Sequence, residues 1–323
     1  MAYYILFDTE TTGITKRDRI IQVGAMIIEN KNKPDIYDEL CSTDVAIPVE
    51  AMMVHGITPD KIANKPKFIN TKFYHKLNEL NNNSNFLIAH NIQFDLDMLK
   101  KEGFENSLNL IDTFRCSRHL LQHEDRHKLQ YLRYSLQLYK DEAVEAKKHN
   151  ITIKAHDAIG DVLVMKLLLS KLVSIVRVKF PEVNPMSKLV ELTKTKAVLH
   201  KINFGKHSGK TIKEIYDTDR SYLRWLLENT DDEDMIYTIN MLNQEKNDTQ
   251  PYKPYKTNKQ NSTNLPQATK IVEIMPFGKY KGVKLVDICE KDMEYIDWLL
   301  ENTDDEKFKK QLEYSVDKLI NEI

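Results

Sequence analysis

Hydrophobic and polar positions alternate along the first 180 residues in short runs that predict a layered domain. Unbroken apolar runs predict buried strands at 3–7, 19–29, 85–90 and 108–112, the second with a bulge at Gly24. Apolar positions at helical spacing predict helices at 66–80, 94–102, 113–121, 128–139 and 157–178. Strands interleaved with helices indicate an α/β fold, with a mixed β-sheet flanked by helices.

The rest of the chain holds two copies of one segment. INFGKHSGKTIKEIYDTDRSYLRWLLENTDDED begins at Ile202, and MPFGKYKGVKLVDICEKDMEYIDWLLENTDDEK begins at Met275, with a constant offset of 73 residues. An ungapped match of this length indicates a duplication, and each copy is long enough only for a small α+β module.

These patterns predict five consecutive parts of the chain. The stretch 243–270 is rich in Asn, Lys, Thr, Gln and Pro, and Leu265 is its one aliphatic residue larger than Ala. Such a stretch cannot bury enough apolar surface to offset its ordering entropy, so it is expected to be a flexible linker. The predicted order is a first domain at 1–180, a connector at 181–200, a first module at 201–242, the linker at 243–270 and a second module at 271–323.

Composition and charge exclude several classes of protein. The 323 residues are 41% hydrophobic and 29% charged, which is typical of a folded chain. With 47 Lys and Arg against 48 Asp and Glu, any nucleic-acid site must be a local one. Three widely spaced cysteines favour a reducing compartment. No membrane span or secretory signal is visible, so we expect a cytoplasmic protein of a bacterial or virus-infected cell.

Acidic residues stand at the ends of several predicted elements. Asp8 and Glu10, two apart at the end of a strand, point to the same face and would repel unless a hard divalent cation held them. Asp95 and Asp161 fall in the first turns of predicted helices, and His156 precedes the second of these helices. Taken singly, these residues would be explained as well by an exposed strand edge or by helix capping.

Three motifs that contain these residues carry a family resemblance. FDTETTG (7–13), AHNIQFD (89–95) and HDAIGD (156–161) resemble, in order, the motifs of the DEDDh 3′→5′ exonucleases, whose members include proofreading epsilon subunits and exonuclease X-like proteins. The resemblance implies a ribonuclease H-like fold. It also implies that Asp8, Glu10, Asp95 and Asp161 bind two Mg²⁺ or Mn²⁺ ions and that His156 is the general base. The expected products are 5′-mononucleotides released from a 3′ end.

The same resemblance suggests residues that contact substrate. Glu50 and His55 match a family feature that faces the terminal nucleotide, although alone they would read as polar residues on a surface turn. Thr9 and Thr12 could add contacts beside the metals, or could reflect only strand propensity and turn chemistry. The full set expected to bind substrate is Thr9, Glu10, Thr12, Glu50, His55, Asn91 and Phe94. IDT (111–113) and HKLQYL (127–132) also match family landmarks.

Two short motifs in the chain are misleading. His123 to His127 spells H-E-x-x-H, but the residues between the histidines are all charged and the segment lies between helices, so a zinc site is not expected. The stretch ending in Gly209-Lys210-Thr211 resembles a phosphate-binding loop, but Phe204 occupies the position of its first glycine.

The repeated segment resembles the C-terminal module of exonuclease X-like proteins. Four lysines near its glycine turn could meet phosphates: Lys206, Lys210, Lys279 and Lys281. Tyr222 and Trp225 could stack on bases, but we expect Trp225, like Trp298, to fill the small core of its module. The acidic LLENTDD is expected to end its helix facing solvent. The modules could hold DNA, or a replication or repair protein, near the first domain.

The sequence therefore predicts a metal-dependent 3′→5′ exonuclease acting on single-stranded 3′ ends of DNA. One alternative is an exoribonuclease similar to ribonuclease T, because the sequence shows no site that reads the 2′-hydroxyl. Others are a polymerase-bound proofreading subunit and a catalytically silent protein that only binds nucleic acid, although all five catalytic positions are intact.

Overall fold

The computed structural model describes residues 2–29, 32–152 and 157–245, and a set of positions between 272 and 316. These are 272, 274–275, 279–285, 288–289, 295–296, 299–300, 308–309, 311–312 and 315–316. The chain divides into two compact units, Met1–Gln250 and Pro251–Ile323, which are described separately.

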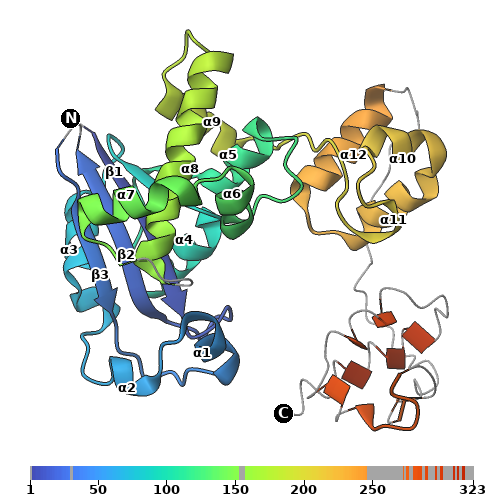
Figure 1. Cartoon of the computed structure of the whole chain (residues 1–323), viewed down its shortest axis with the longest axis horizontal. Helices are drawn as coiled ribbons and strands as arrows, with labels where there is room; N and C mark the ends of the chain where they lie inside the picture. The colour runs from blue at the N-terminus through green and yellow to red at the C-terminus, as the bar shows by residue number, and fades with distance from the viewer. Residues whose placement is uncertain are drawn as a thin grey trace. The chain divides into compact units, whose positions relative to one another are not determined.

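A five-stranded mixed sheet forms the centre of the first unit, with the strand order β3-β2-β1-β4-β5 (Figure 1). Strands β1, β2 and β3 are antiparallel neighbours, whereas β4 and β5 run parallel to β1. Their bounds are Tyr3–Thr11, Ile20–Glu29, Asp35–Leu40, Phe86–Ala89 and Asn109–Asp112. Four of the five were predicted, and β3 was missed because DIYDEL lacks an apolar run.

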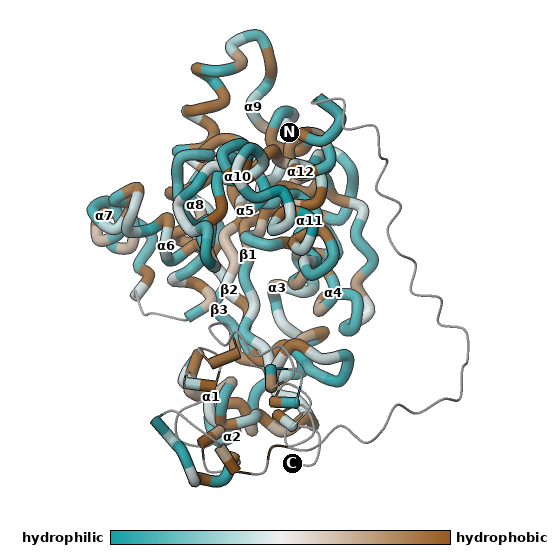
Figure 2. The backbone as a smooth tube through the Cα atoms, turned by 90° about the vertical axis from the view of Figure 1, so that its right-hand side faces the viewer, coloured by the Kyte–Doolittle hydropathy of each residue, from teal (hydrophilic) through white to brown (hydrophobic). Residues whose placement is uncertain are grey.

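Helices pack on both faces of this sheet. Their bounds are α1 Val49–His55, α2 Pro59–Ile62, α3 Lys72–Glu79, α4 Ile92–Lys101, α5 Thr113–Leu120, α6 Leu129–Ser135, α7 Tyr139–His149, α8 Ala158–Lys179 and α9 Pro185–Lys194, with a 3₁₀ turn η1 at Phe68–Asn70. All five predicted helices exist, and α1, α2, α7 and α9 are additional. Along the helices in Figure 2, hydrophobic and hydrophilic residues alternate, as expected for elements with one buried face.

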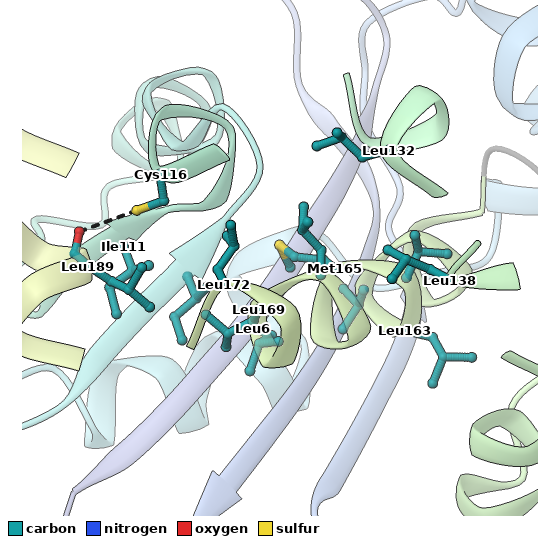
Figure 3. Packing of buried hydrophobic residues seen from close by; sticks show 14 of the residues in the cluster. Leu6, Ile111, Cys116, Leu132, Leu138, Leu163, Met165, Leu169, Leu172 and Leu189 are labelled. Carbon is teal, nitrogen blue, oxygen red and sulfur yellow. Dashed lines mark hydrogen bonds between the residues drawn. The ribbon is translucent and has the colours of Figure 1, made fainter. Parts of the chain in front are cut away.

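Two hydrophobic cores hold the layers together. On one face, Leu6 of β1 packs with α8, α5 and α9, and Figure 3 shows Leu163, Leu169 and Leu172 of α8 in this core. On the other face, Ile5 and Phe7 of β1 pack with α3 and α4. The alternation along β1 therefore assigns even-numbered residues to the α8 side and odd-numbered residues to the α4 side.

The predicted bulge at Gly24 is wrong. Gly24 pairs in regular register with Asp8 and Asp38, and the irregularity in this part of the sheet lies between Glu10 and Thr11. A Cβ atom at Gly24 would lie 2.3 Å from the backbone nitrogen of Ile159. The glycine is needed because the start of α8 crosses the sheet at this point.

Helix α9 fills much of the stretch predicted as a connector. Leu189 and Leu192 are buried in the core on the α8 side, and the thiol of Cys116 in α5 donates to the carbonyl of Leu189 at 3.4 Å (Figure 3). This helix is therefore part of the packed first domain. Cys116 and Cys41 are buried free thiols, and burial raises the pKa of each to about 12.

The first repeat is a small helical module with its own core. It comprises a 3₁₀ turn, η2 (Gly205–His207), and the helices α10 (Ile212–Thr218), α11 (Arg220–Asn229) and α12 (Glu233–Glu245). A capping box at Thr211 and Glu214 starts α10. Because α12 ends at Glu245, the predicted linker begins later than 243, and its residues 246–270 lie outside those described.

The second unit repeats this pattern at the same offset. The bridge between Lys201 and Thr211 has its counterpart between Ile274 and Lys284. Buried Met275, Leu285, Ile288, Ile296, Leu299, Phe308 and Leu312 correspond to buried residues of the first module. The duplication seen in the sequence is thus a duplication of the core.

Within the part of the chain that the structure describes, no helix has the length and apolarity required to cross a membrane.

Candidate active site

Strand β1 carries two carboxylates on the face that α8 covers. Asp8 and Glu10 follow Leu6 at intervals of two residues, so their side chains leave the strand on the α8 side. Both side chains are only partly buried. Thr9, between them, points to the α4 side and is 7% exposed.

The close approach at Gly24 places the start of α8 next to these carboxylates. Gly24 is the partner of Asp8 in the sheet, and the backbone of Ala158 and Ile159 lies directly over it. Asp161 stands in the first turn of α8. Its charge raises the pKa values of both Asp8 and Glu10. The first and third sequence motifs therefore lie close together in the fold.

Helix α4 adds Asp95 from the opposite side of β1. Asp95 is 3% exposed and accepts a hydrogen bond from the Thr9 hydroxyl, Oγ1 to Oδ1, at 2.7 Å. The helix begins at Asn91, which has a left-handed backbone with φ of 70° and donates its N–H to Oδ1 of Asp112 at 2.9 Å. This turn fixes the first turn of α4 and therefore the position of Asp95.

The grouped carboxylates raise one another's pKa values. Burial, then the charges of Asp95, Asp161 and Glu10, hold the pKa of Asp8 well above its ordinary range. Burial and the charge of Asp161 raise the pKa of Glu10 to about 8. Burial raises the pKa of Asp95 to about 7, although the Thr9 hydroxyl opposes the change.

This donor set suits a hard divalent cation. Neighbouring carboxylates that raise the pKa values of Asp8 and Glu10 form a site that lacks positive charge, and oxygen ligands are those that Mg²⁺ and Mn²⁺ prefer. Among the described residues, no group of three or more His, Cys, Asp or Glu side chains is arranged so that it could hold a metal ion.

Two glutamines outside the predicted site residues donate to carboxylates at the start of α8. Gln130 donates from Nε2 to Oδ1 of Asp161 at 2.6 Å, and it lies in the landmark HKLQYL. Gln22 donates from Nε2 to Oδ1 of Asp157 at 3.0 Å. Asp157 adds its charge to Glu10. Motif spacing gave no sign of these partners, because they come from elements distant in sequence.

The remaining predicted residues divide between the site and the scaffold. Glu50 is exposed in the first turn of α1, and His55 ends that helix with its Nδ1 accepting from the N–H of Ile57 at 3.0 Å. Burial lowers the pKa of His55. Phe94 packs at the edge of the core on the α4 side. The predicted base, His156, lies outside the described residues.

Thr12 requires a correction. It is fully buried, and its hydroxyl donates to Oδ1 of Asp18 at 2.7 Å and accepts from the N–H of Arg19 at 3.1 Å. Its side chain is used to shape the turn after β1, so it is not available for substrate.

Two expectations for the first module are also wrong. Trp225 is 49% exposed and stacks on Tyr222, because leucines and isoleucines already fill the core. The acidic end of the repeat faces solvent at Glu228 and Asp231, and the expectation fails only at Asp232, whose two carboxylate oxygens accept from Arg118 of α5 at 3.0 and 2.5 Å. The partner of an acidic side chain can come from a distant part of the chain, so the sequence of the segment alone does not reveal it.

The lysines predicted to contact nucleic acid are on the surface of the modules. Lys206 forms an ion pair with Asp219 at 2.8 Å and lies over the ring of Tyr222, whereas Lys210 is exposed. In the second unit, Lys279 lies over Tyr280 and Lys281 is exposed. The segment 123–127 is not helical, as expected if it binds no zinc.

A mixed sheet with flanking helices and an acidic group on its central strand defines the class of ribonuclease H-like exonucleases. The chain belongs to the exonuclease family, whose model, described as Exonuclease, matches residues 5–169. A second model, described as Exodeoxyribonuclease X-like C-terminal, matches 202–231 and 275–304, one match in each repeat. The exonuclease family is metal-dependent.

Individual relatives cover different shares of the chain. Exodeoxyribonuclease 10 of Escherichia coli is 26% identical over 231 residues, which are 70% of this chain and 91% of that protein. DNA polymerase III subunit epsilon of Treponema pallidum is 30% identical over 42% of this chain and 64% of its own length. An epsilon-like protein of Rhodobacter capsulatus is 31% identical over 49% of this chain and 22% of its own length.

The chain thus spans less than two thirds of the latter two relatives. Among solved structures, exonuclease X in complex with 5′ overhanging duplex DNA aligns with 60% of this chain and 99% of its own, at 21% identity and a TM-score of 0.43.

Proposed function

We propose that this protein is a metal-dependent 3′→5′ exonuclease that hydrolyses phosphodiester bonds at single-stranded 3′ ends of DNA. One observation carries the proposal: the charges of Asp95 on α4, Asp161 on α8 and Glu10 on β1 all act on Asp8, so carboxylates from these three elements lie near one another. Membership in the exonuclease family and the relation to exodeoxyribonuclease 10 support the reaction and favour DNA over RNA.

The four carboxylates would hold two Mg²⁺ or Mn²⁺ ions, which supply activation of water and neutralisation of charge on the phosphate. The Thr9 hydroxyl donates to Oδ1 of Asp95, which fixes the orientation of this carboxylate. His156 takes a proton from the attacking water. The water oxygen bonds to phosphorus, the bond from phosphorus to the 3′ oxygen of the preceding nucleotide breaks, and this oxygen takes up a proton. A 5′-mononucleotide leaves, and the shortened strand ends in a 3′-hydroxyl.

Helix α1 supplies contacts to the terminal nucleotide. Nε2 of His55 is buried and has no hydrogen-bond partner among the described residues, and the lowered pKa keeps the ring neutral at neutral pH. A neutral ring can hydrogen-bond to a sugar hydroxyl without adding charge. Exposed Glu50, in the first turn of the same helix, would accept from the 3′-hydroxyl.

The repeats serve to keep the strand near this site. Exposed Trp225, stacked on Tyr222 with a ring-centroid separation of 5.6 Å, offers an aromatic face of the kind that binds unpaired bases. The exposed lysines Lys210 and Lys281 would contact phosphates, and the second module could alternatively hold a replication or repair protein.

The decisive experiment digests single- and double-stranded DNA and RNA, labelled at either end, with Mg²⁺ and with Mn²⁺. We expect mononucleotides to appear first from 3′-labelled single-stranded DNA and a descending ladder from the 5′-labelled strand. Internal cuts, or label released first from the 5′ end, would exclude the proposed polarity, and faster digestion of RNA would favour the exoribonuclease.

The role of His156 has a separate test. His156→Ala should lower the rate about 10²–10⁴-fold, which is the usual effect of removing a general base. His75→Ala is the matched control, because His75 is exposed on α3, away from the acidic group. Equal rates for the two variants would remove His156 from the mechanism.

A further inference from the structure

A cleft of about 490 Å³ lies where the first domain meets the first repeat. One wall is the segment 122–128, between α5 and α6, and the other is the segment 198–204, which enters the module. Both walls belong to the same compact unit of the chain.

Ion pairs hold the two walls together. Arg118 binds Asp232 through both of its terminal nitrogens and also lies 2.8 Å from Oδ2 of Asp234, which is fully buried. Lys201 pairs with Asp125 across the cleft. The cleft is therefore preformed, so a ligand would not have to order it.

The ion pairs neutralise two acids that line the cleft, whereas two cations of the lining have no acidic partner among the described residues. Asp125 and Asp232 are both paired, which leaves Glu124, with a side chain 11% exposed, as the remaining acid of the lining. Arg126 and Lys128 are exposed and form no ion pair among the described residues. The cleft thus presents unpaired positive charge, which favours an anionic ligand.

An aromatic side chain stands beside this charge. Phe204 lines the cleft and is 49% exposed. It lies two residues after Ile202, which is buried in the core of the module. An exposed ring beside unpaired cations is the combination by which proteins bind unpaired bases and their phosphates.

The cleft wall continues into the acidic group. The ring of His90, at the end of β4, donates from Nε2 to the carbonyl of His127 at 2.8 Å. Two residues after Lys128, Gln130 donates to Asp161. A strand bound along 126–128 would consequently lie two residues along the chain from Gln130, which holds Asp161.

We propose that this cleft binds single-stranded DNA upstream of the 3′-terminal nucleotide, with Arg126 and Lys128 on phosphates and Phe204 against a base. The inference rests on the proposed exonuclease function and specifies how its substrate is held. It makes the first repeat a part of the substrate site, and it predicts that long strands are bound more tightly than short ones.

The test compares a double variant, Arg126→Ala with Lys128→Ala, with a control of equal charge change, Lys171→Ala with Lys213→Ala, whose lysines are exposed elsewhere on the same unit. Affinity for fluorescein-labelled (dT)₂₀ is measured by anisotropy in EDTA over a range of salt. We expect the cleft variant to bind about 10-fold or more weakly, with a salt slope smaller by about 1.4, at roughly 0.7 per phosphate contact on a single strand.

Phe204→Leu should also weaken (dT)₂₀ binding, and Phe204→Tyr should restore it, because a tyrosine ring stacks as phenylalanine does. Cleavage is then compared between (dT)₂₀ and a thymidine dinucleotide. The ratio of kcat/KM for the long to the short substrate should fall in the cleft variant and stay constant in the control.

Binding of (dT)₂₀ by the cleft variant equal to that of the control would overturn the proposal, as would an equal loss on both substrates. Tighter, cleft-dependent binding of (rU)₂₀ would overturn the assignment to DNA. Since binding in EDTA needs no turnover, failure of the wild-type protein to cleave any strand would refute the exonuclease function and not this inference.

Discussion

Gln130 donates a hydrogen bond from its side-chain amide to Oδ1 of Asp161 over 2.6 Å. Its own Oε1 accepts from Arg133 at 3.2 Å, and Arg133 binds both oxygens of buried Glu142 at 2.5 Å. A continuous chain of polar contacts thus runs from α7 through α6 to the acidic group on α8, and it fixes which way the Asp161 carboxylate faces.

Replacing Gln130 should therefore weaken metal use without unfolding the domain. For Gln130→Ala we expect the Mn²⁺ concentration for half-maximal activity to rise about 10–100-fold, the usual effect of losing a partner of a metal ligand. Gln93→Ala is the control, because Gln93 lies on α4 and bonds only to exposed Asp97 among the described residues. An unchanged Mn²⁺ dependence in Gln130→Ala would show that Asp161 needs no such partner.

Gly24→Ala should damage both stability and activity. The new Cβ would lie 2.3 Å from the Ile159 nitrogen, so α8 would have to move away from β1, at a cost of about 1–3 kcal/mol. The movement would separate Asp161 from Asp8. Gly209→Ala is a useful comparison, because Gly209 has φ of 84° but nothing near its Cβ position, and its cost should be only backbone strain with no change in Mn²⁺ affinity. Equal Mn²⁺ affinity in both variants would contradict this account.

The metal-free protein should lose stability as pH rises. The pKa of Glu10 is about 8 in the folded state against an ordinary value of 4.5, so between these values the folded state holds a proton that the unfolded state releases. Glu10→Gln cannot ionise, and in EDTA its advantage in unfolding free energy over the wild type should grow by about 3–4 kcal/mol from pH 5 to pH 8. Urea unfolding at several pH values measures this, and a constant difference would mean that Glu10 is not in a like-charged environment.

The contact between the first module and the exonuclease domain depends on Asp234. Asp234 is fully buried, accepts from Arg115 at 3.0 Å and lies beside Arg118, whereas the second repeat has Lys307 at the corresponding position. Asp234→Lys should cost about 3–5 kcal/mol by leaving buried cations unpaired. The exposed neighbour Glu233, changed to Lys, should cost far less. Limited proteolysis between 196 and 204 would report release of the module, and equal protection in both variants would contradict the docking role.

The sequence predicted the elements that carry strong apolar runs, and its three motifs predicted the acids that the structure brings together. What it could not predict depends on contacts between distant segments. A bulge was predicted at Gly24 because the sequence around a single glycine does not show that a distant helix crosses the strand there. Trp225 suggested a core residue because size alone does not show which helix face is buried. The pairing of Asp232 could not be predicted because Arg118, its partner, lies more than a hundred positions earlier.

Carboxylates from β1, α4 and α8 are proposed to hold divalent cations together. Titration of the metal-free protein with Mn²⁺ measures this binding, because the electron paramagnetic resonance signal of the free ion is lost when the ion is bound. The account predicts that the wild type binds two ions and that Asp8→Asn and Asp161→Asn each lose binding to a comparable extent, although their residues lie in separate elements. Unchanged Mn²⁺ binding in either variant would contradict it.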